Sequence, residues 1–198
     1  MFKKQFQRSL LLFALALPAQ ASVVVSINTN TTQTQVGGNV SFAVNISGLD
    51  SAVALGSYDL SVNFDPALLQ FNSATFGDPI LGDQLDVAQS GLNFPAALAG
   101  EGLVSLIEFS LDDSSDLLGQ QADDFTLARL FFTAISPGIS PLNLAVNSLA
   151  DTDSTSLSAA SVDSFVSIVT APVPVPAAIW LFTPALILLM RKQRNLQG

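Results

Sequence analysis

Carboxylates are the only abundant side chains in this sequence that could take part in catalysis or metal binding. All sixteen Asp and Glu residues lie between Asp50 and Asp163, and the chain has no His and no Cys. Catalytic triads, thiol nucleophiles and imidazole metal sites are therefore excluded. The region between the two ends also lacks Lys, which excludes Schiff-base chemistry there. Two chemistries remain for the carboxylates, calcium binding and acid–base hydrolysis.

Two acidic loops, DDSSD and DTDST, are candidate calcium sites. Calcium takes about six to eight oxygen ligands, and closely spaced carboxylates on loops can supply several of them. Neither stretch has the twelve-residue calcium-loop pattern with its central Gly and final Glu, so solvated turns are the preferred interpretation of both. The candidate ligands are Asp112, Asp113, Asp116, Asp151 and Asp153, with Asp123 and Asp124 a few residues beyond the first loop.

A pair of carboxylates is also sufficient for a glycosidase. Glu101 and Glu108 are candidates for such a pair, and they lie in or beside the alternating segment LVSLIEFSL. That position favours a solvated face of a strand over an active site. We therefore predict no enzyme, and no cofactor apart from the calcium candidates.

The elements that carry these residues are predicted to be β-strands. Apolar residues alternate with polar ones, as in NVSFAVNIS over 39–47 and SYDLSVNF over 57–64, and clusters of Gly, Asn, Asp, Ser and Pro separate the runs. Helical periodicity is limited to about one turn at PALLQ, over 66–70. About eight or nine short strands favour an all-β, two-sheet sandwich over a parallel sheet covered by helices.

The segment from Val36 to Asp78 resembles the cohesin-like domain. It has a Gly-bearing turn that enters an alternating strand, followed by GSYDLSVNFDPALLQF, in which Asp65-Pro66 ends a strand and Leu69 and Phe71 return to the core. Residues 125–134 resemble the strand before the last hairpin of that family, and residues 143–168 resemble the hairpin itself.

This resemblance covers most of residues 22–170 and implies a jelly-roll β-sandwich. The cohesin-like fold is related in shape to many carbohydrate-binding modules, and cohesins of cellulase scaffolds bind a dockerin partner through one sheet face. No residue type in this sequence identifies such a face, so the resemblance predicts a fold more directly than a function.

The charge of the domain excludes nucleic acid as a partner. Arg129 is the only cation among the residues that carry all sixteen acidic side chains, so this region has a formal charge of 1 − 16 = −15. A polyanion would be repelled by such a surface.

The N-terminus has the features of a signal peptide over residues 1–21. Lys3, Lys4 and Arg8 form a positive region, and the apolar stretch LLLFALAL that follows is too short to cross a bilayer. Ala19 and Ala21 supply the small–x–small pattern that signal peptidase recognises, so we expect cleavage before Ser22. The exported domain has no disulfides, and a core of Val, Ile, Leu and Phe must stabilise it instead.

The C-terminus is divided into a Pro-rich linker (171–176), an apolar segment (177–190) and a basic end (191–198). The apolar segment would span about 21 Å as a helix, against about 30 Å for a bilayer core, and Pro184 interrupts it. Arg191, Lys192 and Arg194 would stop transfer and stay on the cytoplasmic side.

This tail resembles a PEP-CTERM sorting signal of the VPxP type. The matching residues are Val173, Pro174, Val175 and Pro176, followed by AAIWLF and RKQR. In bacteria that use PEP-CTERM signals, a membrane enzyme, exosortase, recognises the tail and removes its apolar segment. Val175 replaces the usual Glu, and Pro184 stands where such tails often carry Gly or Ser. A permanent single-span anchor is the alternative.

We therefore expect a non-catalytic protein that a Gram-negative bacterium exports to its surface or extracellular matrix, with a role in adhesion or exopolysaccharide and biofilm association. Its partners would be signal peptidase, exosortase and the membrane during transit, then polysaccharide or another surface protein. The alternative is a carbohydrate- or dockerin-type binding module, and a hydrolase that uses carboxylates alone is a weaker third option. A carbohydrate-binding module should expose a flat row of aromatic side chains, whereas the phenylalanines of this chain fall mostly on core-facing positions.

Overall fold

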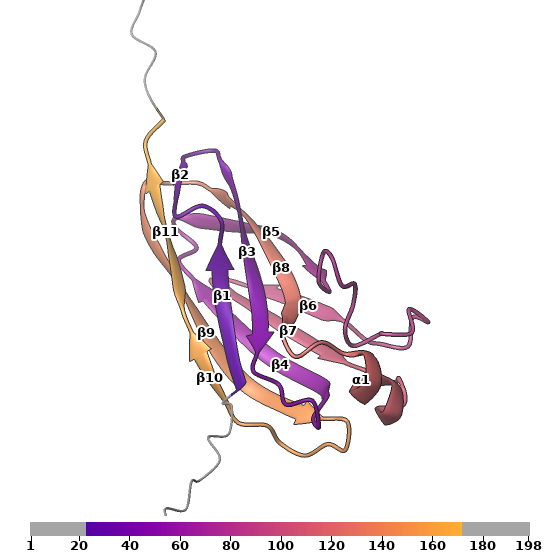
Figure 1. Cartoon of the computed structure of the whole chain (residues 1–198). Coiled ribbons are helices and arrows are strands. Elements are labelled where there is room, and N and C mark those ends of the chain that lie inside the picture. Colours follow the sequence, from indigo (N-terminus) through magenta and orange to yellow (C-terminus); the bar gives the residue numbers. More distant parts are fainter. Residues whose placement is uncertain (1–22, 172–198) are drawn as a thin grey trace, which may run out of the picture.

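The computed structural model describes residues 23–171, which form two β-sheets packed face to face and one short helix (Figure 1). The β-sandwich predicted from the alternating sequence is confirmed. The expected signal peptide and the expected sorting motif, apolar segment and basic end lie outside the described residues. Within residues 23–171, no helix has the length and hydrophobicity needed to cross a bilayer.

The first sheet has five strands, in the order β10-β1-β3-β8-β5. Their bounds are β10 Ala159–Val162, β1 Val23–Thr29, β3 Asn39–Ser47, β8 Phe125–Ala134 and β5 Leu69–Phe76. All neighbours pair antiparallel except β1 and β10, which run parallel. The side chains of β3 that were predicted to share one face are all buried: Val40, Phe42, Val44 and Ile46.

The second sheet has six strands, in the order β2-β11-β9-β4-β7-β6. Their bounds are β2 Gln33–Gln35, β11 Ser164–Val169, β9 Gly138–Asp151, β4 Leu55–Phe64, β7 Leu103–Phe109 and β6 Ala96–Gly100. The alternating residues of β4 face the core as predicted: Tyr58, Leu60, Val62 and Phe64. Each fully buried side chain of this size contributes roughly 1.5–3 kcal/mol relative to an exposed one.

Phe132 of β8 is at the centre of the aromatic part of the core. Its ring meets those of Phe42, Phe64 and Phe71 edge-on, with centroids 5.8, 5.0 and 5.5 Å away. These contacts join β3, β4 and β5 and therefore connect both sheets. The predicted return of Leu69 and Phe71 to the core is confirmed, since Leu69 is buried and Phe71 packs against the core.

Three short strands and the helix were not predicted. The strands β2, β6 and β10 raise the number from the expected eight or nine to eleven. In the expected last hairpin, the chain leaves β9, joins the other sheet as β10 and returns as β11.

The helix α1 (Ser114–Gln120) is at DDSSD, where only a turn was expected, and buries Leu117. The single helical turn expected at PALLQ is confirmed as a hydrogen-bonded turn over residues 66–68. The Asp65 carboxylate accepts a hydrogen bond from the backbone N–H of Ala67, and its carbonyl accepts hydrogen bonds from Leu68 and Leu69.

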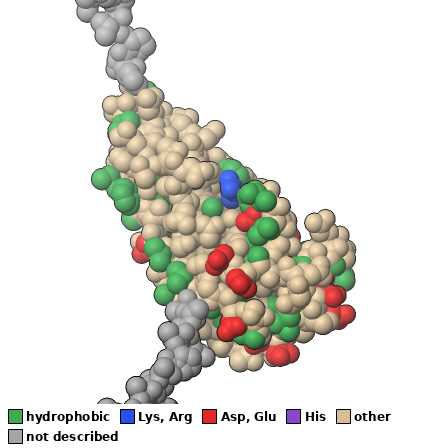
Figure 2. All heavy atoms as spheres, in the orientation of Figure 1, with side chains coloured by type: hydrophobic (Ala, Val, Ile, Leu, Met, Phe, Trp, Pro, Cys, Tyr) green, Lys and Arg blue, Asp and Glu red, His purple; other side chains and the backbone are tan. Residues whose placement is uncertain are grey.

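The two ends of the described chain emerge from opposite ends of the sandwich. The strand β1 begins beside β10, whereas β11 ends next to β2 at the far end (Figure 1). The helix α1 and the end of β7 lie away from the point where β11 ends. Acidic side chains on the face in Figure 2 lie toward the end that carries α1.

Candidate binding face

The hairpin formed by β6 and β7 is longer than its two strands. Beyond β6 and β7, Asn93 forms an isolated antiparallel bridge with Ser110. The backbone N–H of Phe94 donates to the Phe109 carbonyl at 3.0 Å, and that of Leu111 donates to the Leu92 carbonyl at 2.7 Å. The register of β6 and β7 is therefore continued to residues 92 and 111.

One side of this hairpin faces the core, and the other side is apolar and faces solvent. Val104, Leu106 and Glu108 point inward and are buried. Because side chains alternate between the faces of a strand, the residues between them share the outer face. We call this set the hairpin outer face, and its strongly exposed members are Leu92, Phe94, Leu98, Phe109 and Leu111, with exposed fractions of 42–61%.

Phe94 and Phe109 stack on each other in the hairpin outer face. Their ring centroids are 4.8 Å apart and their planes differ by 19°. Most phenylalanines of the described chain face or touch the core, as predicted, but this pair and Phe165 on β11 are exposed. The signal that was missed is in LVSLIEFSL, where the more apolar of the two alternating sets is the one that faces outward, while the inward set includes Glu108 and Ser110.

The neighbouring strands β4 and β9 give the same sheet a polar outer surface. The amide of Asn147 donates to the Asp59 carboxylate and the Ser61 hydroxyl, both at 2.9 Å. The outer face of the six-stranded sheet thus has an apolar part on β6–β7 and a polar part on β4–β9. An exposed apolar area with a polar border is typical of an interaction surface.

A buried polar cluster lies on the inner side of the hairpin. Tyr58 donates its hydroxyl hydrogen to Glu108 Oε2 at 2.7 Å. Asn93 Nδ2 donates to Glu108 Oε1 at 2.8 Å and to Asp83 Oδ2 at 2.6 Å. The prediction of a solvated face for Glu108 is therefore wrong, because its side chain is 1% exposed, whereas Glu101 lies exposed at the hairpin turn.

Burial raises the pKa of Glu108 to about 8. The hydrogen bonds from Tyr58 and Asn93 oppose this change, while the charge of Asp83 and a hydrogen bond with it favour the protonated form of Glu108. Burial and the nearby Glu108 also hold the pKa of Tyr58 well above its ordinary value. The cluster contains no cation that could stabilise two carboxylates, so Glu108 is protonated at neutral pH.

The loop between β5 and β6 carries Asp83 and Asn93 and is fixed at several other points. Leu85 is buried, and Gln84 accepts a hydrogen bond from the backbone N–H of Ala122 at 2.9 Å. Burial raises the pKa of Asp78, but hydrogen bonds from the backbone N–H groups of Leu81, Ile80 and Thr126 outweigh it and lower the pKa overall. The loop is therefore an ordered part of the domain.

The calcium candidates of the two acidic loops do not come together as a cluster of carboxylates. Among residues 23–171 there is no group of three or more Asp and Glu placed to hold a metal ion. Asp113 precedes α1 without capping it through its side chain. Asp151 accepts hydrogen bonds from the backbone N–H groups of Asp153 and Thr155, which is the behaviour of a turn residue.

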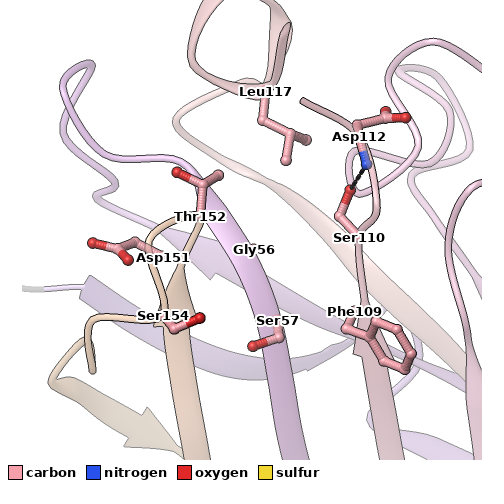
Figure 3. Close-up of a pocket in the computed structure, with 9 residues that line it drawn as sticks. All are labelled: Gly56, Ser57, Phe109, Ser110, Asp112, Leu117, Asp151, Thr152 and Ser154. Carbon is pink, nitrogen blue, oxygen red and sulfur yellow. Dashed lines mark hydrogen bonds between the residues drawn. The ribbon is translucent and has the colours of Figure 1, made fainter. Parts of the chain in front are cut away.

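Asp112 and Asp151 do line one pocket of about 200 Å³ between α1 and the ends of β4, β7 and β9 (Figure 3). Both carboxylates point away from its centre, where Leu117 and hydroxyls such as that of Ser57 lie instead. The spacing of these residues in the sequence could not predict that the two loops line one pocket. They meet there because β4 pairs with both β7 and β9. The remaining lining residues are Gly56, Phe109, Ser110, Thr152 and Ser154.

The fold and sequence pattern together match a known family. The family model of the cohesin domain matches residues 23–163. The chain belongs to the cohesin family. The predicted resemblance is therefore confirmed, and the match covers nearly all of the described cohesin domain. Among curated proteins, no sequence matches the chain significantly.

Solved structures of cohesins share this fold at low sequence identity. A non-cellulosomal cohesin from Archaeoglobus fulgidus is 16% identical, with a TM-score of 0.56 over 75% of this chain and 92% of that one. The cohesin of a type I cohesin–dockerin complex from Clostridium thermocellum is 14% identical, with a TM-score of 0.59 over 75% and 99%. A cohesin module of a family 33 glycoside hydrolase from Clostridium perfringens is 15% identical, with a TM-score of 0.58 over 76% and 99%.

Proposed function

We propose that this chain is an exported, non-catalytic protein-binding module, and that it binds its partner through the hairpin outer face, at the β6–β7 edge of the six-stranded sheet. The observation that carries this proposal is the hairpin outer face, where the stacked rings of Phe94 and Phe109 are exposed together with their apolar neighbours. Large exposed aromatic side chains at the centre of a surface are the usual source of binding energy at protein interfaces.

The partner is a dockerin-bearing protein or another surface protein. A similar cohesin from Clostridium thermocellum was solved in a type I complex with a dockerin. The formal charge of −15 on the domain favours a partner with basic residues around an apolar centre, since complementary charge speeds association and suppresses wrong partners. A second copy of this acidic domain lacks that complementarity.

Catalysis has no support in this arrangement. Cohesin domains are non-catalytic binding modules. Glu108 is buried and engaged by Tyr58 and Asn93, while Glu101 lies exposed at the turn of the hairpin. The two residues lack the shared, accessible site that a carboxylate pair needs in a glycosidase.

The sequences of the two termini support delivery of the domain to the cell surface. We propose that residues 1–21 direct export and that residues 171–198 form a PEP-CTERM tail cut by an exosortase-type enzyme, which leaves the cohesin domain (residues 22–170) and the Pro-rich linker up to about Pro176. Cohesin homologues are typically extracellular or surface modules, which supports export. Because β11 ends far from α1 and from the end of β7 (Figure 1), a chain held by its tail would present the hairpin outer face away from the attachment point.

A polysaccharide is the second candidate ligand, because Phe94 and Phe109 form an exposed aromatic stack beside a pocket lined by hydroxyls. Sugar rings stack on such surfaces. This ligand would fit the expected role in adhesion and biofilm association. Affinity electrophoresis in gels that contain the exopolysaccharide of the producing bacterium separates the two ligands, since only polysaccharide binding retards the chain there.

A double variant of the hairpin outer face tests protein binding. Immobilised wild type, F94S/F109S and the control F165S are exposed to the extracellular proteins of the producing bacterium. We expect one partner to be retained by the wild type and F165S, and at least tenfold less of it to be retained by F94S/F109S. The affinity of the purified partner for each of the three proteins is then measured by calorimetry. Equal retention by all three proteins would show that the hairpin outer face is not the binding surface.

A further inference from the structure

The carboxyl groups of Glu108 and Asp83 are close neighbours that a single amide connects. Asn93 Nδ2 lies within hydrogen-bond distance of an oxygen on each, at 2.8 Å and 2.6 Å. Glu108 is part of β7, whereas Asp83 and Asn93 belong to the loop before β6. The protonation of these carboxyl groups therefore affects the interaction between the loop and the sheet at this point.

No positive charge is present to balance two carboxylates at this place. Arg129 is the only cation of the described chain, and it lies on β8 in the other sheet. The remaining groups that face Glu108 are the Tyr58 hydroxyl from β4 and the Asn93 amide from the loop. Asp86, also in the loop, is turned toward the backbone N–H groups of Ser90 and Gly91.

We propose that Glu108, protonated beside the Asp83 carboxyl group, forms a pH-sensitive latch, which keeps residues 86–94 and hence Phe94 in place on the hairpin outer face. This inference rests on the proposed function, because the latch regulates the proposed binding surface. A carboxyl group buried beside a second, half-buried one does not ionise readily, so Glu108 loses its proton only at raised pH. The pKa of Glu108, raised to about 8 by burial and by Asp83, agrees with this geometry.

Loss of the proton releases a segment that few other bonds hold. When Glu108 gives its proton to water, two adjacent carboxylates repel each other across Asn93. Within the loop, the backbone N–H groups of Gln89, Ser90 and Gly91 stay bonded to Asp86. The backbone bonds that then tie residues 88–94 to the rest of the domain are those of Ala88 to Asp112 at 3.4 Å, Leu111 to Leu92 at 2.7 Å and Phe94 to Phe109 at 3.0 Å. Leu85 and Gln84 anchor the earlier part of the loop to the core and to Ala122, so the opening is local.

Hydrogen–deuterium exchange on the full chain, at a series of pH values from about 6 to 9.5, tests the latch. The comparison is between the wild type, E108Q and E101Q, and each variant is compared with the wild type at the same pH to remove the intrinsic pH dependence of exchange. E108Q imitates the neutral carboxyl, whereas E101Q makes the same change at the exposed turn of the same hairpin. We expect protection of residues 86–94 to fall at least tenfold with a midpoint near pH 8 in the wild type and E101Q, and to stay constant in E108Q.

A direct titration of the Glu108 carboxyl carbon by NMR on the wild type keeps the test decisive if E108Q folds poorly. A midpoint above 7 supports the latch, and a midpoint below 6 overturns it. Equal loss of protection in wild type and E108Q, or no loss in the wild type, overturns it as well. If the latch opens as expected but F94S/F109S binds the partner normally, the latch is retained and the proposed binding surface is rejected.

Discussion

Phe94 and Phe109 stack across the hairpin at 4.8 Å, and the residue that precedes each of them belongs to the buried polar cluster on the other side of the sheet. Asn93 precedes Phe94, Glu108 precedes Phe109, and the two are joined by a hydrogen bond of 2.8 Å. Because neighbouring residues of a strand point to opposite faces, the backbone couples the exposed aromatic pair directly to the buried carboxyl. The position of the candidate binding surface and the protonation of the core thus depend on the same few peptide units.

The free energy of unfolding should fall as the pH rises from about 5 to 9. The pKa of Glu108 is raised to about 8 in the folded chain from an ordinary value of 4.5, so the native state binds more protons than the unfolded state in this range. Its stabilising effect is complete below the unfolded value and is lost as the pH rises through the folded value. The full loss is roughly 3–5 kcal/mol, reduced if residues 86–94 open locally.

Urea unfolding at several pH values measures this dependence, and the composition of the chain makes the result specific. With no His and no Cys, no other side chain of ordinary pKa titrates in that range. E108Q should have a nearly flat profile, and E101Q should follow the wild type. A wild-type profile as flat as that of E108Q would contradict the raised pKa.

Gln121→Ala should lower the free energy of unfolding by about 1–3 kcal/mol. The side-chain oxygen of Gln121 accepts a hydrogen bond from the backbone N–H of Leu55 at 2.6 Å, and its nitrogen donates to the carbonyls of Leu55 and Gln84 at 3.0 and 2.8 Å. Leu55 is fully buried, so its N–H would lose its partner without access to water.

The neighbouring Gln120, exposed at the end of α1, provides the matched control. Urea denaturation of Q121A and Q120A should give a lower midpoint for the first variant only. Equal midpoints would mean that Gln121 does not hold the loop to β4.

The alternation of the sequence was sufficient to predict the sandwich because the core-facing sets are consistently apolar. Val40, Phe42, Val44 and Ile46 on β3 alternate with polar or small residues, and this pattern fixes which face is buried. The short strands were missed because three to five residues carry too little pattern. The helix α1 was missed because its seven residues bury only Leu117.

The candidate binding face could not be predicted, since it depends on pairing between distant residues. In LVSLIEFSL, Glu108 was expected on a solvated face, whereas it is buried and its neighbour Phe109 is 42% exposed. The reversal is possible because Tyr58 and Asn93, which are 50 and 15 residues away, satisfy the carboxyl group. A buried polar group is tolerated only where such partners exist, and sequence alone does not show them.

Calcium should leave the melting temperature of the chain unchanged and should give no heat of binding by calorimetry. The reason is that the candidate carboxylates at 112–116 and 151–153 do not form a group of three within the described residues. If calcium does raise the melting temperature, D113N/D116N and D153N identify the loop responsible, because only variants of the ligating loop abolish the increase. That result would restore the calcium interpretation of the loop concerned.

The processing of the tail should be visible in the intact mass of the protein from surface and culture fractions. We expect a species that begins at Ser22 and ends near Pro176, because a sequence with alternating prolines favours the extended backbone that a protease cleft accepts. The variant P174A/P176A should keep RKQRNLQG and stay in the membrane, whereas P184A, which changes a proline inside the apolar segment, should be processed like the wild type. A membrane-bound wild-type species that retains this basic end would establish the permanent anchor instead, and the cohesin domain would then act at the cell surface only.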